Sequence, residues 1–359
     1  MELNDFPVFK TLTEGVAETF DLNSPEGRQA YFQAKAGQEI IKLKAYLAEK
    51  SFVAFLLGKK NSGKGTYTKL FMEAVGAEHV GHISVGDIVR DAHQIFETGK
   101  GKDELLAFLK ENYRGFHGVH EIEDIVLGKN QTTLLSSELI ISLIKYEISK
   151  RPRQAIFIDG FPRALDQINY ALFLKEIVGY RHEPDFFVFI SVPNSIIDER
   201  IKYRVICPVC KTPRNTKLLA TNNVGFDEAT DQFYLNCDNP NCSAMGTRMV
   251  GKEGDELGIE PIRDRIEMDN QIFKQLLQLE GVPKIYLRNS VPVEKAKDFV
   301  EDYELTPAYH YRQDPATSKV ETVEEPWTAK DDAGIESYSL LPSAVALSLI
   351  KQVAKTLGL

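Results

Sequence analysis

The 359-residue chain has no excess of positive charge, no long apolar run and few cysteines. Its net charge of −9 argues against a general nucleic-acid-binding protein, because such proteins are basic. No run of about 18 apolar residues is present, so we expect no membrane span. The first residues, MELNDFPVFK, lack the basic and then apolar pattern of a signal segment. We therefore expect a cytoplasmic protein with no nucleic-acid or membrane partner.

All four cysteines lie between positions 207 and 242. Because disulfides are rare in intracellular proteins, this clustering indicates a metal site. Cys207 and Cys210 come from the stretch CPVC, and Cys237 and Cys242 come from CDNPNC. Four thiolates suit a structural Zn²⁺ and leave no open position for catalysis. A four-cysteine iron or iron–sulfur site is one alternative, and four free thiols are the other.

Short apolar runs alternate with helical segments along most of the chain. Predicted strands cover residues 52–57, 155–159, 186–192 and 284–288, with a further short strand at 82–84. Predicted helices cover 26–49, 66–75, 137–149, 166–178, 194–204, 261–280 and 343–357. This alternation is typical of an α/β fold with a doubly wound parallel sheet. Ligands of such sheets bind at the carboxyl ends of the strands, where Gly58, Asp159 and Pro193 are located.

The stretch FLLGKKNSGKGTYTK joins a predicted strand to a predicted helix and nearly matches the phosphate-binding pattern G-x-x-x-x-G-K-[ST]. Gly58, Gly63 and Lys64 are in place, but Gly65 stands where Ser or Thr is usual, and Thr66 follows. The backbone N–H groups of such a loop surround a phosphate, and its lysine reaches the outer phosphates. The alternative interpretation is a glycine-rich turn that binds nothing.

Two other stretches place charged side chains at strand ends. HISVGDIVR directs Asp87 and Arg90 toward the same space, and FIDGFPRALDQ delivers Asp159, Arg163 and Gln167 after a buried strand. Arginine makes two-pronged contacts with phosphate, and the amide of Gln167 offers hydrogen bonds to the edge of a base. These residue types indicate a site for a nucleotide.

Taken together, the three stretches resemble the adenylate kinases and related nucleoside monophosphate kinases. The loop of that family typically reads G-x-P-G-x-G-K-G-T, so GKGT is the family's own variant, and DGFPRALDQ is close to its most diagnostic string. The resemblance covers residues 50–305. It implies a P-loop kinase fold with an inserted acceptor-binding segment, a lid, and ATP with Mg²⁺ as the donor.

The resemblance also implies a role for each matching residue. Mg²⁺ would be held by Asp87 and Asp159, largely through water. Donor-nucleotide residues would be Gly58, Ser62, Gly63, Lys64, Gly65, Thr66, Arg200 and Arg204. Acceptor residues would be Ser84, Val85, Arg90, Leu135, Gly160, Arg163 and Gln167. The catalytic set would be Lys64, Arg90, Arg163, Arg200 and Arg265, the last from the stretch EPIRDRI.

Three features depart from the family pattern. Val85 stands where adenylate kinases usually have a threonine, which leaves the acceptor base open between AMP and a pyrimidine monophosphate. The arginine that usually ends the lid is missing, and Arg248 and Lys252 are the candidates to replace it. The segment 91–131 is longer than usual. The histidines of its HGVH stretch, at 117 and 120, have no evident third ligand, so we interpret them as surface residues.

The expected organisation follows from these assignments. Residues 1–50 would form an N-terminal helical extension, 51–305 the kinase core with inserts at 85–150 and 206–259, and 306–359 a linker and a final helix. The insert at 206–259 would be a lid with a structural Zn²⁺, as the family often has. We expect a monomer that converts ATP and AMP to two ADP. The alternatives are a UMP or CMP acceptor, or a nucleotide-binding regulator with little transfer activity.

Overall fold

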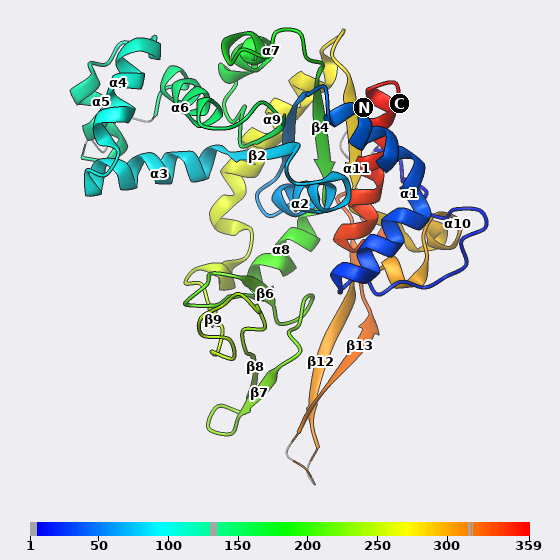
Figure 1. Ribbon diagram of the computed structural model, residues 1–359. Coiled ribbons are helices and arrows are strands. Elements are labelled where there is room, and N and C mark those ends of the chain that lie inside the picture. Colours follow the sequence, from blue (N-terminus) through cyan, green and yellow to red (C-terminus); the bar gives the residue numbers. More distant parts are fainter. Residues whose placement is uncertain (1–5, 130–134, 315–316, 318) are drawn as a thin grey trace.

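The computed structural model describes residues 6–129, 135–314, 317 and 319–359. Its centre is a five-stranded parallel sheet with the strand order β10–β4–β1–β3–β2 (Figure 1). The strands are β1 (Val53–Gly58), β2 (Val80–Ser84), β3 (Ala155–Asp159), β4 (Asp185–Ser191) and β10 (Lys284–Arg288). The predicted α/β fold with a parallel sheet is confirmed. The strand order reverses direction at β1, which is the point where ligands bind in such sheets.

Helices cover both faces of this sheet. The hydrophobic cluster on one face includes Ala54 and Leu56 of β1, and the cluster on the other face includes Phe55 and Leu57. The first cluster is completed by α1 (Pro25–Leu47), α2 (Lys64–Val75), α8 (Asn194–Lys202) and α11 (Pro342–Thr356). The second is completed by α3 (Val85–Thr98), α4 (Lys102–Asn112), α5 (Val119–Val126), α6 (Ser137–Ser149), α7 (Gln167–Ile177) and α9 (Arg263–Gln278). Apolar side chains alternate between the two faces because successive residues of a strand point to opposite sides.

The first and last helices pack beside each other on the central domain. The last helix, α11, contacts α1, α2 and β10 (Figure 1). Most of α11 is buried, including Leu349, Ile350 and Val353, each 0% exposed. A helix buried on nearly all sides is part of the core rather than a surface appendage.

The described part of residues 306–335, which we expected to form a linker, carries three strands instead. Strands β12 (Pro307–Gln313) and β13 (Val320–Pro326) form an antiparallel hairpin. Strand β14 (Thr328–Lys330) pairs with β15 (Glu336–Ser339), which in turn pairs with β11 (Ser290–Pro292). Composition misled the prediction because these strands are half exposed and therefore rich in Thr, Glu and Lys. Tyr309, Tyr311 and Trp327 supply the contacts that anchor them to the rest of the protein.

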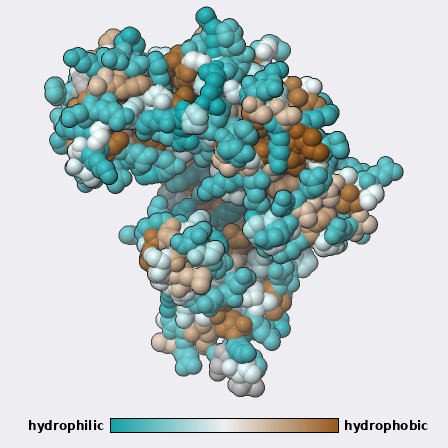
Figure 2. Space-filling model, viewed as in Figure 1, coloured by the Kyte–Doolittle hydropathy of each residue, from teal (hydrophilic) through white to brown (hydrophobic). Residues whose placement is uncertain are grey.

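Two inserts project from the region near the carboxyl ends of the strands. One comprises α3 to α6, and the other contains β5 (Arg204–Ile206), β6 (Pro213–Asn215), β7 (Val224–Asp227), β8 (Gln232–Leu235) and β9 (Val250–Gly251). Figure 2 shows a hollow between this second insert and the layers above it. The short helix α10 (Ala296–Phe299) follows β11. Of the helices in the described ranges, none has the length and apolar character needed to cross a membrane.

Candidate functional site

The glycine-rich loop at 59–63 joins β1 to α2. Asn61 and Gly63 adopt left-handed backbone conformations with φ values of 63° and 95°. A β-carbon at Gly63 would lie 2.7 Å from the Tyr67 ring, so glycine is required there. Within the part of the chain that the structure describes, no side chain caps the first turn of α2. Its N–H groups are therefore available to an anion, as at other helix N-termini.

Lys64, the first residue of α2, is held across this loop. Its Nζ donates hydrogen bonds to the carbonyl oxygens of Gly58 at 2.6 Å and Lys59 at 3.0 Å. The same Nζ lies 3.8 Å from Oδ1 of Asp159, at the end of β3. Burial lowers the pKa of Lys64, and the carboxylate of Asp159 opposes that shift. The ammonium group is thus placed between the loop and the end of the neighbouring strand.

A cavity of about 600 Å³, called the loop cavity below, opens over this loop. Its walls come from the loop, β2, β3, α8, the second insert and the C-terminal segment, including Ser62, Gly65, Thr66, His82, Ser84, Asp87, Asp159, Arg200 and Arg204. Several buried atoms on its wall, among them Ser62 Oγ, His82 Nε2 and Asp159 Oδ1, have no hydrogen-bond partner among the described residues. Burial lowers the pKa of His82, so its imidazole is neutral at neutral pH. Unpaired buried polar atoms of this kind are typical of a site that a polar ligand completes.

Two arginines and an aspartate meet Lys64 in an adjoining cavity of about 20 Å³. The cavity is lined by Arg163 from the loop after β3 and by Arg265 and Asp269 from α9. Burial lowers the pKa of Arg163, and the nearby Arg265 lowers it further. A β-carbon at Gly160 would lie 2.5 Å from Nη2 of Arg163, so the glycine leaves room for the guanidinium. Three cations around one small space are suited to bind phosphate oxygens.

Arg200 and Arg204 reach the glycine-rich loop from the other side. Arg200 Nη1 donates to the carbonyl oxygen of Asn61 at 3.2 Å, and Nη2 donates to Oδ1 of Asn289 at 3.1 Å. Arg204 donates to both carboxylate oxygens of Asp255 at 2.7 Å. Both arginines therefore lie on the wall of the loop cavity, where the sequence predicted the donor nucleotide.

The residues predicted to bind the acceptor are less tightly gathered. Arg90 lies on an exposed part of α3 and pairs with Asp87, and it lies near enough to Arg163 to affect the pKa of that residue. Ser84 caps α3 by accepting a hydrogen bond from the Asp87 N–H at 3.4 Å. Leu135 is partly buried beside the hydrophobic cluster around α6.

Two of these acceptor residues face the protein rather than a cavity. Val85 is 5% exposed and belongs to the same hydrophobic cluster. Gln167 is also 5% exposed, and its Oε1 accepts a hydrogen bond from the Arg163 N–H at 2.8 Å. The amide oxygen of Gln167 therefore helps to fix the loop that carries Arg163, which leaves the amide N–H₂ group for a ligand.

Sequence reasoning missed Asp269. One of its carboxylate oxygens is buried without a hydrogen-bond partner in the described residues, and burial raises its pKa. Arg265, Lys64 and Arg163 are close enough to oppose that shift. The spacing offered a signal, because Asp269 follows Arg265 by four residues and so shares its face of a helix.

The chain is similar in sequence to several known proteins. An adenylate kinase of Thermotoga petrophila is 31% identical over 156 residues, which are 43% of this chain and 59% of that protein. An adenylate kinase of Kosmotoga olearia is 28% identical over 187 residues, covering 49% of this chain and 74% of that protein. An adenylate kinase of Syntrophomonas wolfei is 25% identical over 225 residues, covering 62% and 84%. No protein-family model matches the chain.

The chain is similar in sequence to adenylate kinases. The match to the Thermotoga proteins spans less than two thirds of their length, 59% for Thermotoga petrophila. It also leaves more than half of this chain unmatched in that comparison. Part of this chain therefore has no counterpart in those matches.

The two candidates for the missing lid arginine, Arg248 and Lys252, differ in position. Arg248 Nη1 donates to Asp227 at 2.8 Å, and its guanidinium lies over the Tyr234 ring. Both partners belong to the second insert itself. Lys252, by contrast, is one of the charges that lower the pKa of Lys60 in the glycine-rich loop, together with burial. Lys252 is thus the candidate that lies near the loop cavity.

The four cysteine thiols of the second insert converge on one point. Their Sγ atoms all lie within 4.8 Å of one another, with Cys207 to Cys242 at 3.9 Å and Cys210 to Cys237 at 3.7 Å. Zn–S bonds of about 2.3 Å in a tetrahedron place sulfur atoms about 3.8 Å apart, so the thiols fit a zinc ion. Hydrogen bonding with Thr212 lowers the pKa of Cys210 to about 6, which favours its thiolate. Among the described residues no other such group was found, and the pair at 117 and 120 forms none.

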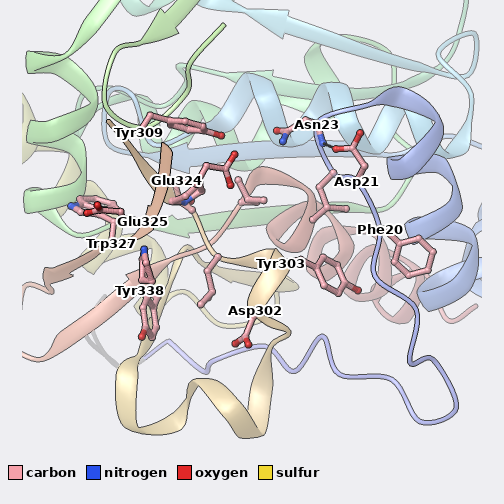
Figure 3. Close-up of a pocket in the computed structure, with 16 residues that line it drawn as sticks. Phe20, Asp21, Asn23, Asp302, Tyr303, Tyr309, Glu324, Glu325, Trp327 and Tyr338 are labelled. Atoms are coloured by element: carbon pink, nitrogen blue, oxygen red, sulfur yellow. Dashed lines mark hydrogen bonds between the residues drawn. The ribbon is translucent and has the colours of Figure 1, made fainter. Parts of the chain in front are cut away.

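Another cavity, of about 520 Å³, lies between residues 20–23, which precede α1, and the C-terminal strands (Figure 3). Aromatic side chains surround it, among them Phe20, Tyr309, Trp327 and Tyr338. Four carboxylates line it, those of Asp21, Asp302, Glu324 and Glu325, and none of its sixteen lining residues is basic. Carboxylates repel phosphates, so the loop cavity is the better candidate for a nucleotide.

Proposed function

We propose that this protein is a nucleoside monophosphate kinase that transfers the terminal phosphoryl group of Mg·ATP to AMP, giving two ADP. The observation that carries the proposal is the convergence of Lys64, Arg163 and Arg265 beside the end of β3. Phosphoryl transfer needs positioning and cancellation of negative charge, and little other chemistry from the protein. Adenylate kinases among its relatives support the same reaction class.

Each side of the proposed site has its own task. On the donor side, Gly58, Ser62, Gly63, Gly65 and Thr66 surround the phosphates with backbone N–H groups and a hydroxyl, and Lys64 binds the outer phosphates. Arg200 and Arg204 bind the donor nucleotide. On the acceptor side, Arg90 and Arg163 bind the monophosphate, with Ser84, Val85, Leu135, Gly160 and Gln167 around the nucleoside. Arg265 stabilises the negative charge on the phosphoryl group in the transition state of transfer.

Two metal ions belong to the proposal. Asp87 and Asp159 would hold Mg²⁺ through water, and the unpaired buried Oδ1 of Asp159 fits such a role. When bound, Mg²⁺ neutralises part of the charge on the donor phosphates. Cys207, Cys210, Cys237 and Cys242 would hold a structural Zn²⁺ that stabilises the lid at 206–259. A closed lid excludes water, which would otherwise hydrolyse the donor.

We further propose a cytoplasmic monomer organised as an N-terminal extension (1–50), a kinase core (51–305) with an acceptor insert at 85–150, and a C-terminal segment (306–359). AMP is the preferred acceptor because Gln167 is present, whereas relatives that use UMP or CMP tend to have Asn there. The buried Val85 has no hydrogen bond to offer a base, which is why the pyrimidine acceptors stay in the test.

The test is a transfer assay with Mg·ATP and each of AMP, CMP, UMP, GMP and dTMP. We expect an AMP-dependent rate that Lys64→Ala abolishes and that Lys42→Ala, which removes an exposed lysine of α1, leaves unchanged. Preference for CMP or UMP would reassign the acceptor. Donor binding without transfer to any acceptor would overturn the kinase and support a nucleotide-binding regulator.

A further inference from the structure

A tight turn of the C-terminal segment, at residues 331–334, contacts the glycine-rich loop and the start of α8. The turn joins β14 to β15 and is fixed from within, because Oδ1 of Asp331 accepts the N–H groups of Ala333 at 3.0 Å and Ile335 at 2.9 Å. Arg288 at the end of β10 holds the same carboxylate through Oδ2 at 3.2 Å. The next residue, Asp332, is therefore presented in a defined position.

Asp332 joins two elements that are far apart in the sequence. Its Oδ2 lies 2.8 Å from Nζ of Lys59, and its Oδ1 accepts the backbone N–H of Asn194 at 2.7 Å. Lys59 is the first residue of the glycine-rich loop, and Asn194 is the first residue of α8. A carboxylate at the first turn of a helix is also favoured by the helix dipole.

Lys59 cannot serve as a phosphate-binding lysine in this arrangement. The residue is 3% exposed, and its Nζ donates to Asp332, to Oδ1 of Asn194 at 2.8 Å and to the carbonyl oxygen of Val192 at 3.2 Å. An ammonium group has three N–H donors, so all of them are used. A buried ammonium that loses its carboxylate is strongly destabilised, and the loop that carries it must then rearrange.

Both anchored elements carry parts of the proposed donor site. The carbonyl oxygen of Lys59 accepts a hydrogen bond from Lys64, and α8 carries Arg200, which donates to Asn61 of the same loop. The C-terminal segment is also linked to Arg200 through Asn289. Asn289, which is 0% exposed, accepts a hydrogen bond from Arg200 and another from Ser339 at 3.0 Å.

We propose that Asp332 is a positioning residue of the donor site: through Lys59 and the start of α8, it fixes the spacing between the glycine-rich loop and the donor arginines. The inference rests on the proposed function, since it assigns the loop cavity to the donor nucleotide. The C-terminal segment would then be an integral part of the donor site. Thr306, Leu341 and Pro342 from that segment also line the loop cavity.

The test compares Asp332→Asn with wild type by two measurements: the Kd of Mg·ATP without acceptor, by calorimetry, and the KM values for ATP and AMP. Misplacement of a binding group by a fraction of an ångström weakens binding substantially, so we expect the donor Kd and KM to rise roughly tenfold and the acceptor KM to change less than twofold. Glu336→Gln is the matched control, because Glu336 is an exposed residue of β15 whose carboxylate accepts a hydrogen bond from the Thr328 hydroxyl. It should leave all three constants unchanged.

Variants of Lys59 test whether Asp332 acts through this lysine. Lys59→Met should raise the donor Kd as much as Asp332→Asn does. The double variant should raise it no further, because the two residues act as one unit. The double variant removes both charges together, which keeps the fold even where a single variant is unstable. Equal changes in donor and acceptor KM, or an unchanged donor Kd, would overturn the inference.

The two proposals fail in distinguishable ways. If wild type binds Mg·ATP but transfers nothing, the kinase proposal fails and the donor Kd of Asp332→Asn still decides the inference. If wild type does not bind Mg·ATP at all, both are wrong. If transfer is normal and Asp332→Asn binds the donor as wild type does, only the inference is wrong.

Discussion

Arg204 and Asp255 form a two-pronged ion pair, with Nε to Oδ2 and Nη2 to Oδ1 both at 2.7 Å. Arg204 begins β5, and Asp255 begins the short 3₁₀ helix Asp255–Leu257. The pair therefore joins the start and the end of the cysteine-bearing insert. Asp255 is 9% exposed, so the carboxylate is shielded from water and the pair is stronger than one on the surface. Residues of this insert, including Arg214 and Leu218, line part of the loop cavity.

Arg204→Lys is expected to loosen that contact while keeping the charge. A lysine is a single flexible point charge and cannot reproduce the fork of a guanidinium. We expect the KM for ATP to rise roughly tenfold, because charge-assisted bonds of this kind contribute about 1.5–3 kcal/mol. Arg181→Lys, which alters an exposed arginine paired with Glu176, is the control. A wild-type KM for ATP in Arg204→Lys would show that the pair has no part in donor binding.

Removal of the metal is expected to unfold the insert and spare the rest of the protein. The thiols of Cys207, Cys237 and Cys242 are buried and packed with Leu235 and Met249 in a small cluster of their own, so the insert has little other core. We expect about one zinc per chain by elemental analysis. Cys237→Ser or a chelator should make the segment 206–259 sensitive to protease while the helical circular dichroism signal persists.

Ser243→Ala is the control for this experiment, since Ser243 is exposed and adjoins Cys242. It should keep both the metal and the resistance to protease. Iron in place of zinc would change the identity of the ion, and the absence of any metal from protein purified without chelators would refute the site.

Much of the fold was predictable because its signals are local. The strands at 155–159 and 284–288 were predicted with their observed bounds, since each is a short apolar run that ends at a polar residue. The four cysteines were predicted to converge because paired short spacings leave few other arrangements. The phosphate-loop pattern likewise predicted a strand, a loop and a helix, all of which are present.

The C-terminal segment was not predictable in the same way. Its strands pair with residues that are distant in the sequence, such as Ser290 with Ser339. A local sequence pattern does not predict such a pairing. The same holds for the contact between Lys59 and Asp332, whose positions differ by 273 residues. Lys59 is one of three lysines in the stretch GKKNSGK, and only the folded structure shows that its ammonium group binds Asp332.

Asp269→Asn is expected to stabilise the protein at neutral pH and to impair transfer. The folded pKa of Asp269 is raised above 3.8, so the folded state binds its proton more tightly than the unfolded state does. The stability that this group contributes is therefore present below pH 3.8 and is lost as the pH rises through its folded pKa. At pH 7 without nucleotide, Asp269→Asn should melt roughly 2 °C higher than wild type.

The predicted increase in the Tm of Asp269→Asn over wild type should depend on pH. The difference in Tm should be largest at pH 7–8 and should narrow as the pH falls toward 5. Asp264→Asn, on the exposed side of the same helix, should show no such trend. Transfer should fall because Arg265 and Lys64 lose a nearby negative charge. A variant that is less stable than wild type at pH 7 would show that the carboxylate is favoured in its ionised form.

Gly160→Ala is expected to weaken acceptor binding by displacing Arg163. Gly160 has a φ of 88°, and an added β-carbon would lie 2.5 Å from the guanidinium. The matched control is Gly179→Ala, because Gly179 has a φ of 83° and open space around its missing β-carbon. Both variants carry the same backbone strain of about 1–2 kcal/mol, so both should lose similar stability.

Only Gly160→Ala moves a proposed binding group. Its KM for AMP should therefore rise at least roughly tenfold, while its KM for ATP and both constants of Gly179→Ala stay near wild type. Parallel changes in both variants would assign the effect to backbone strain alone. An unchanged KM for AMP in a folded Gly160→Ala variant would show that the observed place of Arg163 is not needed to bind the acceptor phosphate.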